Sequence, residues 1–140
     1  MLNFKWIKPD RFEDFNVNKK LLIVDRNNDF RDTLKDYLIT QKLNVEIYEA
    51  NSQDSALKVA LRERPEIVLL EQQLTQIDGK KISKLLKNIV PDSIIVIMSI
   101  FDGEEFQKKF TDEQIDHFIG KNEFNGKLIH VLKKYLAHSQ

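Results

Sequence analysis

Five short apolar segments, most of them rich in β-branched residues, alternate with helical patterns along the chain. The segments are LLIV at 21–24, VEIY at 45–48, IVLL at 67–70, IIVIM at 94–98 and a weaker HFI at 117–119. The first, third and fourth are apolar throughout, which is typical of strands that are covered on both faces. The alternation predicts an α/β fold, a doubly wound, five-stranded parallel sheet with right-handed helical crossovers.

The segments between the strands carry apolar residues at helical spacing. The segment at 52–64 begins with Ser52, which suits a helix N-cap, and places four apolar residues on one stripe, Ala56, Leu57, Ala60 and Leu61. The same pattern predicts further helices over 28–43, 80–90, 103–110 and 123–136.

The composition narrows the class of protein. Lys and Arg together number 22 and so do Asp and Glu, so the net charge of zero supplies no attraction to nucleic acid or anionic lipid. The absence of cysteine excludes a disulfide framework and a thiolate zinc site, and the three histidines lack zinc-ligand spacing. The longest apolar run is far shorter than the roughly 20 residues that cross a bilayer. We therefore expect a cytoplasmic protein without direct contacts to nucleic acid or membrane.

The segment before the first strand, residues 1–19, falls outside the alternating pattern. Apolar and polar residues alternate over 2–6, as in a half-buried strand, whereas Phe12 and Phe15 are three residues apart, as on one helical turn. Two interpretations stay open, an arm packed on its own domain and a docking or dimerisation segment. We assign 1–19 as an N-terminal extension and 20–140 as the folded domain.

Polar side chains follow the predicted strands directly. In open α/β sheets, functional residues gather at the carboxyl ends of the strands, because these ends lie along one edge. The residues at these ends are Asp25, Arg26, Glu49, Glu71, Ser99 and Lys121. Acidic groups, a hydroxyl and a lysine are therefore expected to converge there.

The strand-end motifs resemble those of response regulator receiver domains, the phosphoacceptor modules of bacterial two-component signalling. The resemblance extends from residue 20 to about 136 and rests on four motifs: LLIVDR at 21–26, IVLLEQQLTQIDG at 67–79, IIVIMSI at 94–100 and HFIGKN at 117–122. It implies a flavodoxin-like (βα)5 receiver fold. It also implies the family's site, in which an acidic pair holds Mg²⁺ and an aspartate accepts a phosphoryl group.

Several positions match the family's site. By this resemblance, Asp25 stands at the first acidic position and Ser99 at the hydroxyl position that binds the phosphoryl group. Phe118 matches the aromatic residue that moves with that hydroxyl, and Lys121 matches the lysine that pairs with the phosphoryl charge. Ser99 and Phe118 are thus the switch equivalents.

Other positions depart from the family's pattern. Arg26 stands where the second acidic residue is expected, and Glu71 replaces the phosphoacceptor aspartate; Thr75 and Asn122 replace prolines. A guanidinium in place of a carboxylate repels Mg²⁺, which tolerates little distortion of its oxygen shell. The longer glutamate misplaces its oxygen by roughly 1 Å, which costs orders of magnitude in rate. We expect Mg²⁺ binding to be lost or weak, no other metal or cofactor, and Glu71 to pair with Lys121 or Arg26.

The leading hypothesis is therefore a phosphorylation-independent receiver-like module, a pseudo-receiver, that has no catalytic residues and acts through protein–protein interaction. The alternative is a residual Mg²⁺-dependent phosphoacceptor response regulator in a phosphorelay. The resemblance implies that the fourth helix, fifth strand and last helix form a face for a protein partner or a homodimer. Here that face comprises Phe106, Lys109, Phe110, His117, Lys133, Lys134 and Tyr135. No DNA-binding domain is expected after the last helix, so control of DNA would pass through a partner.

Each site residue also has a purely structural explanation. Asp25 and Arg26 can form an ordinary surface salt bridge, which contributes little to stability. Ser99 can bond to backbone at a strand end, Lys121 can be a solvated loop lysine, and Phe118 can be plain core.

Overall fold

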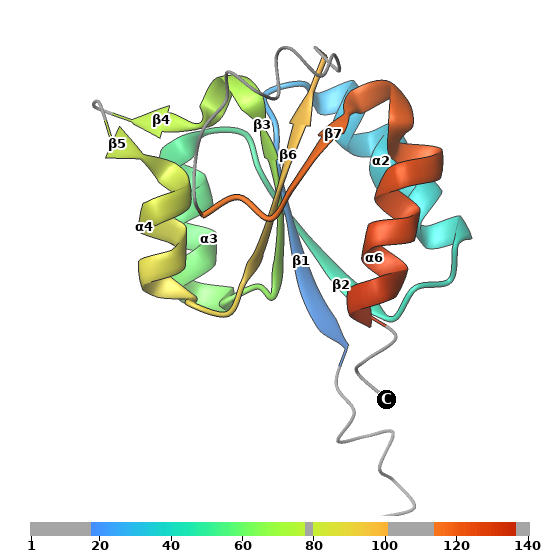
Figure 1. Cartoon of the computed structure of the whole chain (residues 1–140), viewed down its shortest axis with the longest axis horizontal. Helices are drawn as coiled ribbons and strands as arrows, with labels where there is room; N and C mark the ends of the chain where they lie inside the picture. Colours follow the sequence, from blue (N-terminus) through green and yellow to red (C-terminus); the bar gives the residue numbers. More distant parts are fainter. Residues whose placement is uncertain (1–17, 78–79, 101–113, 137–140) are drawn as a thin grey trace, which may run out of the picture.

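The computed structural model describes residues 18–77, 80–100 and 114–136, and its centre is one five-stranded sheet (Figure 1). The strands are β1 (Lys19–Val24), β2 (Val45–Ala50), β3 (Ile67–Glu71), β6 (Ile94–Ser99) and β7 (His117–Gly120). Their order is β2-β1-β3-β6-β7 and every pair is parallel. The five predicted strands and their parallel arrangement are confirmed, and the order places the carboxyl ends of β1, β3, β6 and β7 side by side.

The helices cover both faces of this sheet (Figure 1). They are α2 (Asn28–Thr40), α3 (Gln53–Glu63), α4 (Ile82–Ile89) and α6 (Ile129–Leu136). Successive residues of β1 point to opposite faces, so that Leu21 and Ile23 pack with α2 and α6, whereas Leu22 and Val24 pack with α3 and α4. Burial on both faces explains why this strand is apolar throughout.

Local signals set the ends of the first two helices. The side chain of Asn27 accepts a hydrogen bond from the backbone N–H of Phe30 and starts α2. That helix ends three residues before the predicted Leu43, because Lys42 turns the chain in the left-handed conformation, with φ at 56°. Ser52 caps α3 as expected, in a reciprocal pair with Ser55.

The other predicted helices differ more from the structure. The prediction over 80–90 began too early, because Lys80–Lys81 forms a two-residue strand, β5, that pairs antiparallel with β4 (Gln76–Ile77). The prediction over 123–136 missed a 3₁₀ turn, η3 (Lys121–Glu123), and a π-helical turn, η4 (Phe124–Leu128), which precede α6. A short turn, η2 (Gln72–Leu74), also follows β3. The helix predicted over 103–110 and the extension before Asn18 lie outside the described residues.

Within the described ranges, no helix combines the length and the apolar character that a membrane-spanning segment needs. The longest of the four, α2, has 13 residues.

Candidate functional site

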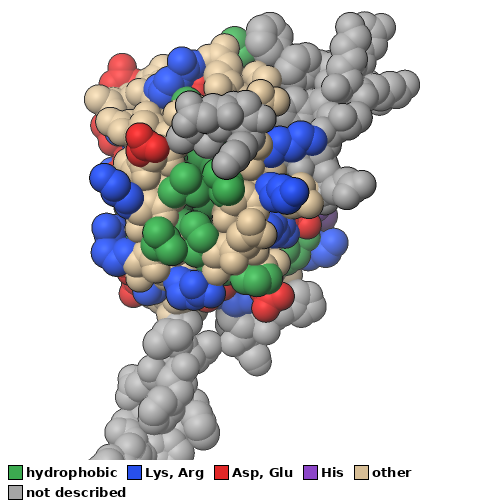
Figure 2. Space-filling model, turned by 90° about the vertical axis from the view of Figure 1, so that its left-hand side faces the viewer, with side chains coloured by type: hydrophobic (Ala, Val, Ile, Leu, Met, Phe, Trp, Pro, Cys, Tyr) green, Lys and Arg blue, Asp and Glu red, His purple; other side chains and the backbone are tan. Residues whose placement is uncertain are grey.

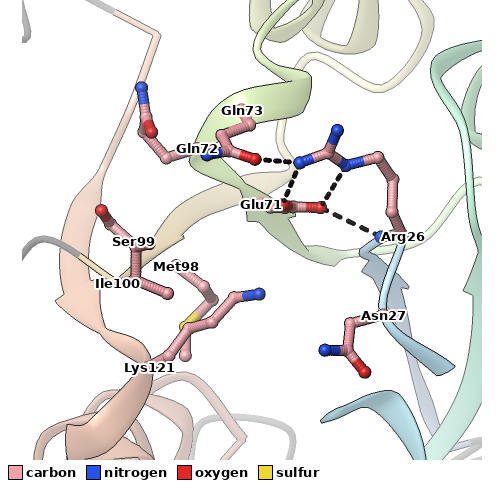
Figure 3. Close-up of a pocket in the computed structure, with 9 residues that line it drawn as sticks. All are labelled: Arg26, Asn27, Glu71, Gln72, Gln73, Met98, Ser99, Ile100 and Lys121. Carbon is pink, nitrogen blue, oxygen red and sulfur yellow. Dashed lines mark hydrogen bonds and ion pairs between the residues drawn. The ribbon is translucent and has the colours of Figure 1, made fainter. Parts of the chain in front are cut away.

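A cavity of about 390 Å³ opens at the carboxyl ends of the strands (Figure 3). Its lining residues come from the ends of β1, β3, β6 and β7 and the loops that follow them: Arg26, Asn27, Glu71, Gln72, Gln73, Met98, Ser99, Ile100 and Lys121. Four of the residues singled out in the sequence, Arg26, Glu71, Ser99 and Lys121, are thus brought together. Gln72 and Gln73 were not predicted as site residues. Their side chains are uncharged, and both residues lie in the turn after β3 instead of at its last position.

Arg26 and Glu71 form a two-point ion pair inside this cavity (Figure 3). Nη2 of Arg26 lies 3.0 Å from Oε2 of Glu71, and Nε donates to Oε1 at 3.4 Å. The backbone N–H of Arg26 donates to the same Oε1 at 3.0 Å, and the guanidinium also donates to the side-chain oxygen of Gln73. The Glu71 side chain is 10% exposed, so both of its oxygens are occupied in a largely buried place.

Lys121 reaches past this pair to a deeper carboxylate. Its Nζ lies 2.6 Å from Oδ2 of Asp25, whose side chain is only 2% exposed. The ammonium group also lies 4.5 Å from the centre of the Phe30 ring, within the range of a cation–π contact. Oδ1 of Asp25 accepts the backbone N–H of Asn27 at 2.8 Å. The interpretations of Asp25 and Arg26 as a surface salt bridge and of Lys121 as a solvated loop lysine are therefore wrong.

The four charges at this edge cancel in two separate pairs. Of the two partners expected for Glu71, the structure gives it Arg26, while Lys121 binds Asp25. Both carboxylates are largely buried, where charges interact strongly. The first pair therefore links the ends of β1 and β3, and the second links the ends of β1 and β7.

A second group of charges supports the loop after β1. Arg31 of α2 donates to the backbone oxygen of Asp25 at 2.5 Å and to Oε1 of Glu49 at 2.9 Å, and Lys35 lies 2.7 Å from Oε2 of Glu49. Burial by itself raises the pKa of the Glu49 carboxyl, but the hydrogen bonds from Lys35 and Arg31 outweigh that effect and lower it below the usual 4.5. Arg31 and Lys35 were missed in the sequence, although both lie one turn apart on the helix that follows Asp25.

Ser99 and Phe118 lie in different surroundings. Ser99, the last residue of β6, is buried and lines the cavity. Phe118 is half-buried on β7 and packs against the core cluster under α3 and α4. It also lines a second cavity, of about 510 Å³, which is bordered by residues of β7, η4 and α6. Of the two expected switch residues, Ser99 lines the strand-end cavity and Phe118 lines the second one.

Within the described ranges, no group of three or more His, Cys, Asp or Glu side chains is arranged to hold a metal ion.

Comparison with known proteins adds to this picture. The family model described as response regulator receiver domain matches residues 21–133. Sensory transduction protein LytT of Bacillus cereus is 33% identical over 122 residues, which are 86% of this chain and 48% of that protein. Sporulation initiation phosphotransferase F of Bacillus subtilis is 31% identical over 85 residues, which are 61% of this chain and 67% of that protein. The chain spans about half the length of the LytT relatives.

Solved structures show the same fold. The signal receiver domain of an HD domain-containing protein from Pseudomonas fluorescens superposes with a TM-score of 0.72 at 18% identity, covering 87% of this chain and 97% of that one. A CheY-like receiver domain protein from Methanospirillum hungatei superposes with a TM-score of 0.69 at 20% identity, covering 87% and 96%.

Proposed function

The chain belongs to the response regulator receiver domain family, and we propose that it is a receiver-like signalling module that works without phosphorylation. The observation that carries this proposal is the double ion pairing at the strand ends, Arg26 with Glu71 and Lys121 with Asp25. These pairs stand where the family has a metal ion and a phosphoryl group, so the charges of the site are already balanced.

The donor set at this edge does not fit Mg²⁺. The ion needs several oxygen ligands in a nearly octahedral arrangement. Here the N–H of Asn27 donates to Oδ1 of Asp25, Lys121 holds the buried Oδ2 by an ion pair without a hydrogen bond, and Arg26 engages both oxygens of Glu71. A metal ion would have to displace two cations from largely buried carboxylates and then tolerate their charge nearby. We therefore propose that the site has little or no affinity for Mg²⁺ and requires no cofactor.

The same pairs oppose phosphoryl transfer. A carboxylate nucleophile needs an oxygen that is free to approach phosphorus in line. Oε1 of Glu71 accepts hydrogen bonds from the backbone and Nε of Arg26, and Oε2 lies 3.0 Å from Nη2. Lys121, the equivalent of the phosphate-pairing lysine, is held by Asp25. We propose a non-enzymatic role on these grounds.

Signalling then passes through a protein partner, which receiver domains use generally. The proposed surface is the face around β7 and α6, where Nε2 of His117 lies 3.0 Å from the hydroxyl of Tyr135 and where Lys133 and Lys134 are exposed. A mixed aromatic and cationic surface suits a protein interface. Phe106, Lys109 and Phe110 of the same predicted face lie outside the described residues. We propose a cytoplasmic protein that binds a partner or a second copy there, without direct contacts to nucleic acid or membrane.

One observation favours the alternative, a residual Mg²⁺-dependent phosphoacceptor. A relative that is 31% identical over 85 residues is called a phosphotransferase, and Ser99 and Lys121 line the cavity. In that case Glu71 would have to release Arg26 before it could react.

The decisive experiment is exposure of the full chain to Mg²⁺ and acetyl phosphate, followed by intact-protein mass spectrometry without acid. We expect no phosphorylated wild-type protein at any time. The doubly substituted variant Arg26→Asp/Glu71→Asp is the matched control, in which the two acidic positions of the family are restored. A phosphorylated wild-type species would overturn the proposal in favour of the alternative.

A further inference from the structure

Helices α3 and α4 together present an apolar face to solvent (Figure 2). Leu57 and Leu61 lie one turn apart on α3, and Leu85 and Ile89 lie one turn apart on α4. Leu61 is 63% exposed, and the other three are only partly buried. A continuous apolar face on two adjacent helices is typical of a surface that binds another segment or protein.

Cationic side chains lie on either side of this face (Figure 2). Lys58 and Arg64 of the α3 segment and Lys84 of α4 are exposed, and none of their side chains has an ion pair or hydrogen bond among the described contacts. Two copies of the face would bring like charges together, which disfavours self-association through it. The occupant that fits is a short segment with aromatic residues between carboxylates.

The chain itself contains such a segment before its first strand. Residues 10–15 read Asp-Arg-Phe-Glu-Asp-Phe, with three acidic side chains next to Phe12 and Phe15. Aromatic rings suit the apolar centre of the α3/α4 face, and the carboxylates suit its cationic rim.

The start of the described chain lies beside the end of α3. The backbone N–H of Lys20 donates to Oε1 of Glu66 at 2.6 Å, and its Nζ lies 3.1 Å from Oε1 of Glu63, the last residue of α3. Residues 10–15 precede Asn18 by three to eight positions, so an extended chain reaches roughly 10–28 Å from it. Helix α3, with 11 residues, is about 16 Å long. The tether therefore suits the length of the face.

We propose that residues 10–15 dock on the α3/α4 face of the same chain, with Phe15 near Leu61 and Phe12 farther along toward Leu57 and Leu85. The short tether gives the segment a local concentration in the millimolar range, so modest contacts are enough to hold it. This docking is independent of the strand-end cavity, and it selects between the two interpretations of the N-terminal extension.

Paramagnetic relaxation tests the docking directly, because the chain has no cysteine and a single introduced one is unique. A nitroxide on Arg11→Cys of the ¹⁵N-labelled full chain, within the docking segment and seven residues before Asn18, should broaden amide signals around residues 57–58 and 85–86 and leave those of α6 sharp. Absence of this selective broadening would overturn the proposal. A mixture of ¹⁵N-labelled chain without nitroxide and unlabelled chain with nitroxide should show none of it. Broadening in that mixture would instead assign the face to a second copy.

Matched variants separate docking from unfolding. Leu61→Ser and Lys84→Glu, both at exposed positions, should each reduce the broadening at α3 and α4 at least twofold. The controls Ile39→Ser, at a residue that is 67% exposed on α2, and Lys133→Glu on α6 should leave it unchanged. Equal effects of test and control variants would contradict docking on this face.

Discussion

Nζ of Lys121 lies 2.6 Å from Oδ2 of Asp25, although the strands that carry them are not neighbours. In the strand order β2-β1-β3-β6-β7, the ends of β3 and β6 lie between them. The lysine therefore ties the two sides of the strand-end cavity together. The resemblance to receiver domains implies that the equivalent lysine pairs with a phosphoryl group, whereas Lys121 in this structure pairs with an internal carboxylate.

Loss of the Lys121 ammonium should destabilise the fold. In Lys121→Met, the buried carboxylate of Asp25 loses its cation, which costs about 3 kcal/mol in free energy of unfolding. Urea denaturation followed by circular dichroism measures the change. The control Lys127→Met breaks an ion pair with Glu123 at the surface, where the Lys127 side chain is 62% exposed. This control should lower the free energy of unfolding by less than about 0.5 kcal/mol.

The cost in Lys121→Met should be partly recovered when the charge of the partner is also removed. Asp25→Asn/Lys121→Met should be more stable than Lys121→Met alone, because no unpaired charge stays buried. If the two variants were equally stable, the ion pair would not be the reason for the loss.

Restoration of the acidic positions should create affinity for Mg²⁺. In Arg26→Asp/Glu71→Asp, the guanidinium is gone and two aspartates line the cavity beside the deeper Asp25, a donor set that suits a hard dication. Isothermal titration calorimetry should detect Mg²⁺ binding to this variant and none to the wild-type chain. Failure of the double variant to bind Mg²⁺ would mean that further residues, such as Lys121, also close the site.

The group formed by Arg31, Lys35 and Glu49 predicts a pH dependence of stability. Because the pKa of Glu49 is lower in the folded chain than its usual 4.5, the carboxylate stabilises the fold above about pH 4.5. This contribution is lost as the pH falls through the lowered pKa. Glu49→Gln should therefore be less stable than wild type by about 1 kcal/mol at pH 7. The difference should shrink toward pH 3 in urea titrations, and a difference that stayed constant with pH would contradict the assignment.

The fold was predictable because its strands are apolar throughout, as in the buried segments at 21–24 and 67–70. The two-residue strands β4 and β5 were not, because such short elements carry no periodic pattern. Convergence of the site residues followed from their positions at strand ends. Their pairing did not, because the reach of Lys121 across two strands and the packing around Asp25 are tertiary properties.

By our proposal, the two internal ion pairs close the site to metal and phosphate. The most direct test of this proposal is a ¹⁵N–¹H correlation spectrum of the full chain with and without Mg²⁺ plus beryllofluoride, a phosphoryl mimic. We predict an unchanged wild-type spectrum, and new shifts only in Arg26→Asp/Glu71→Asp. Wild-type shifts clustered at residues 25–27, 71–73, 99–100 and 118–121 would show a working phosphoacceptor pocket and contradict the account.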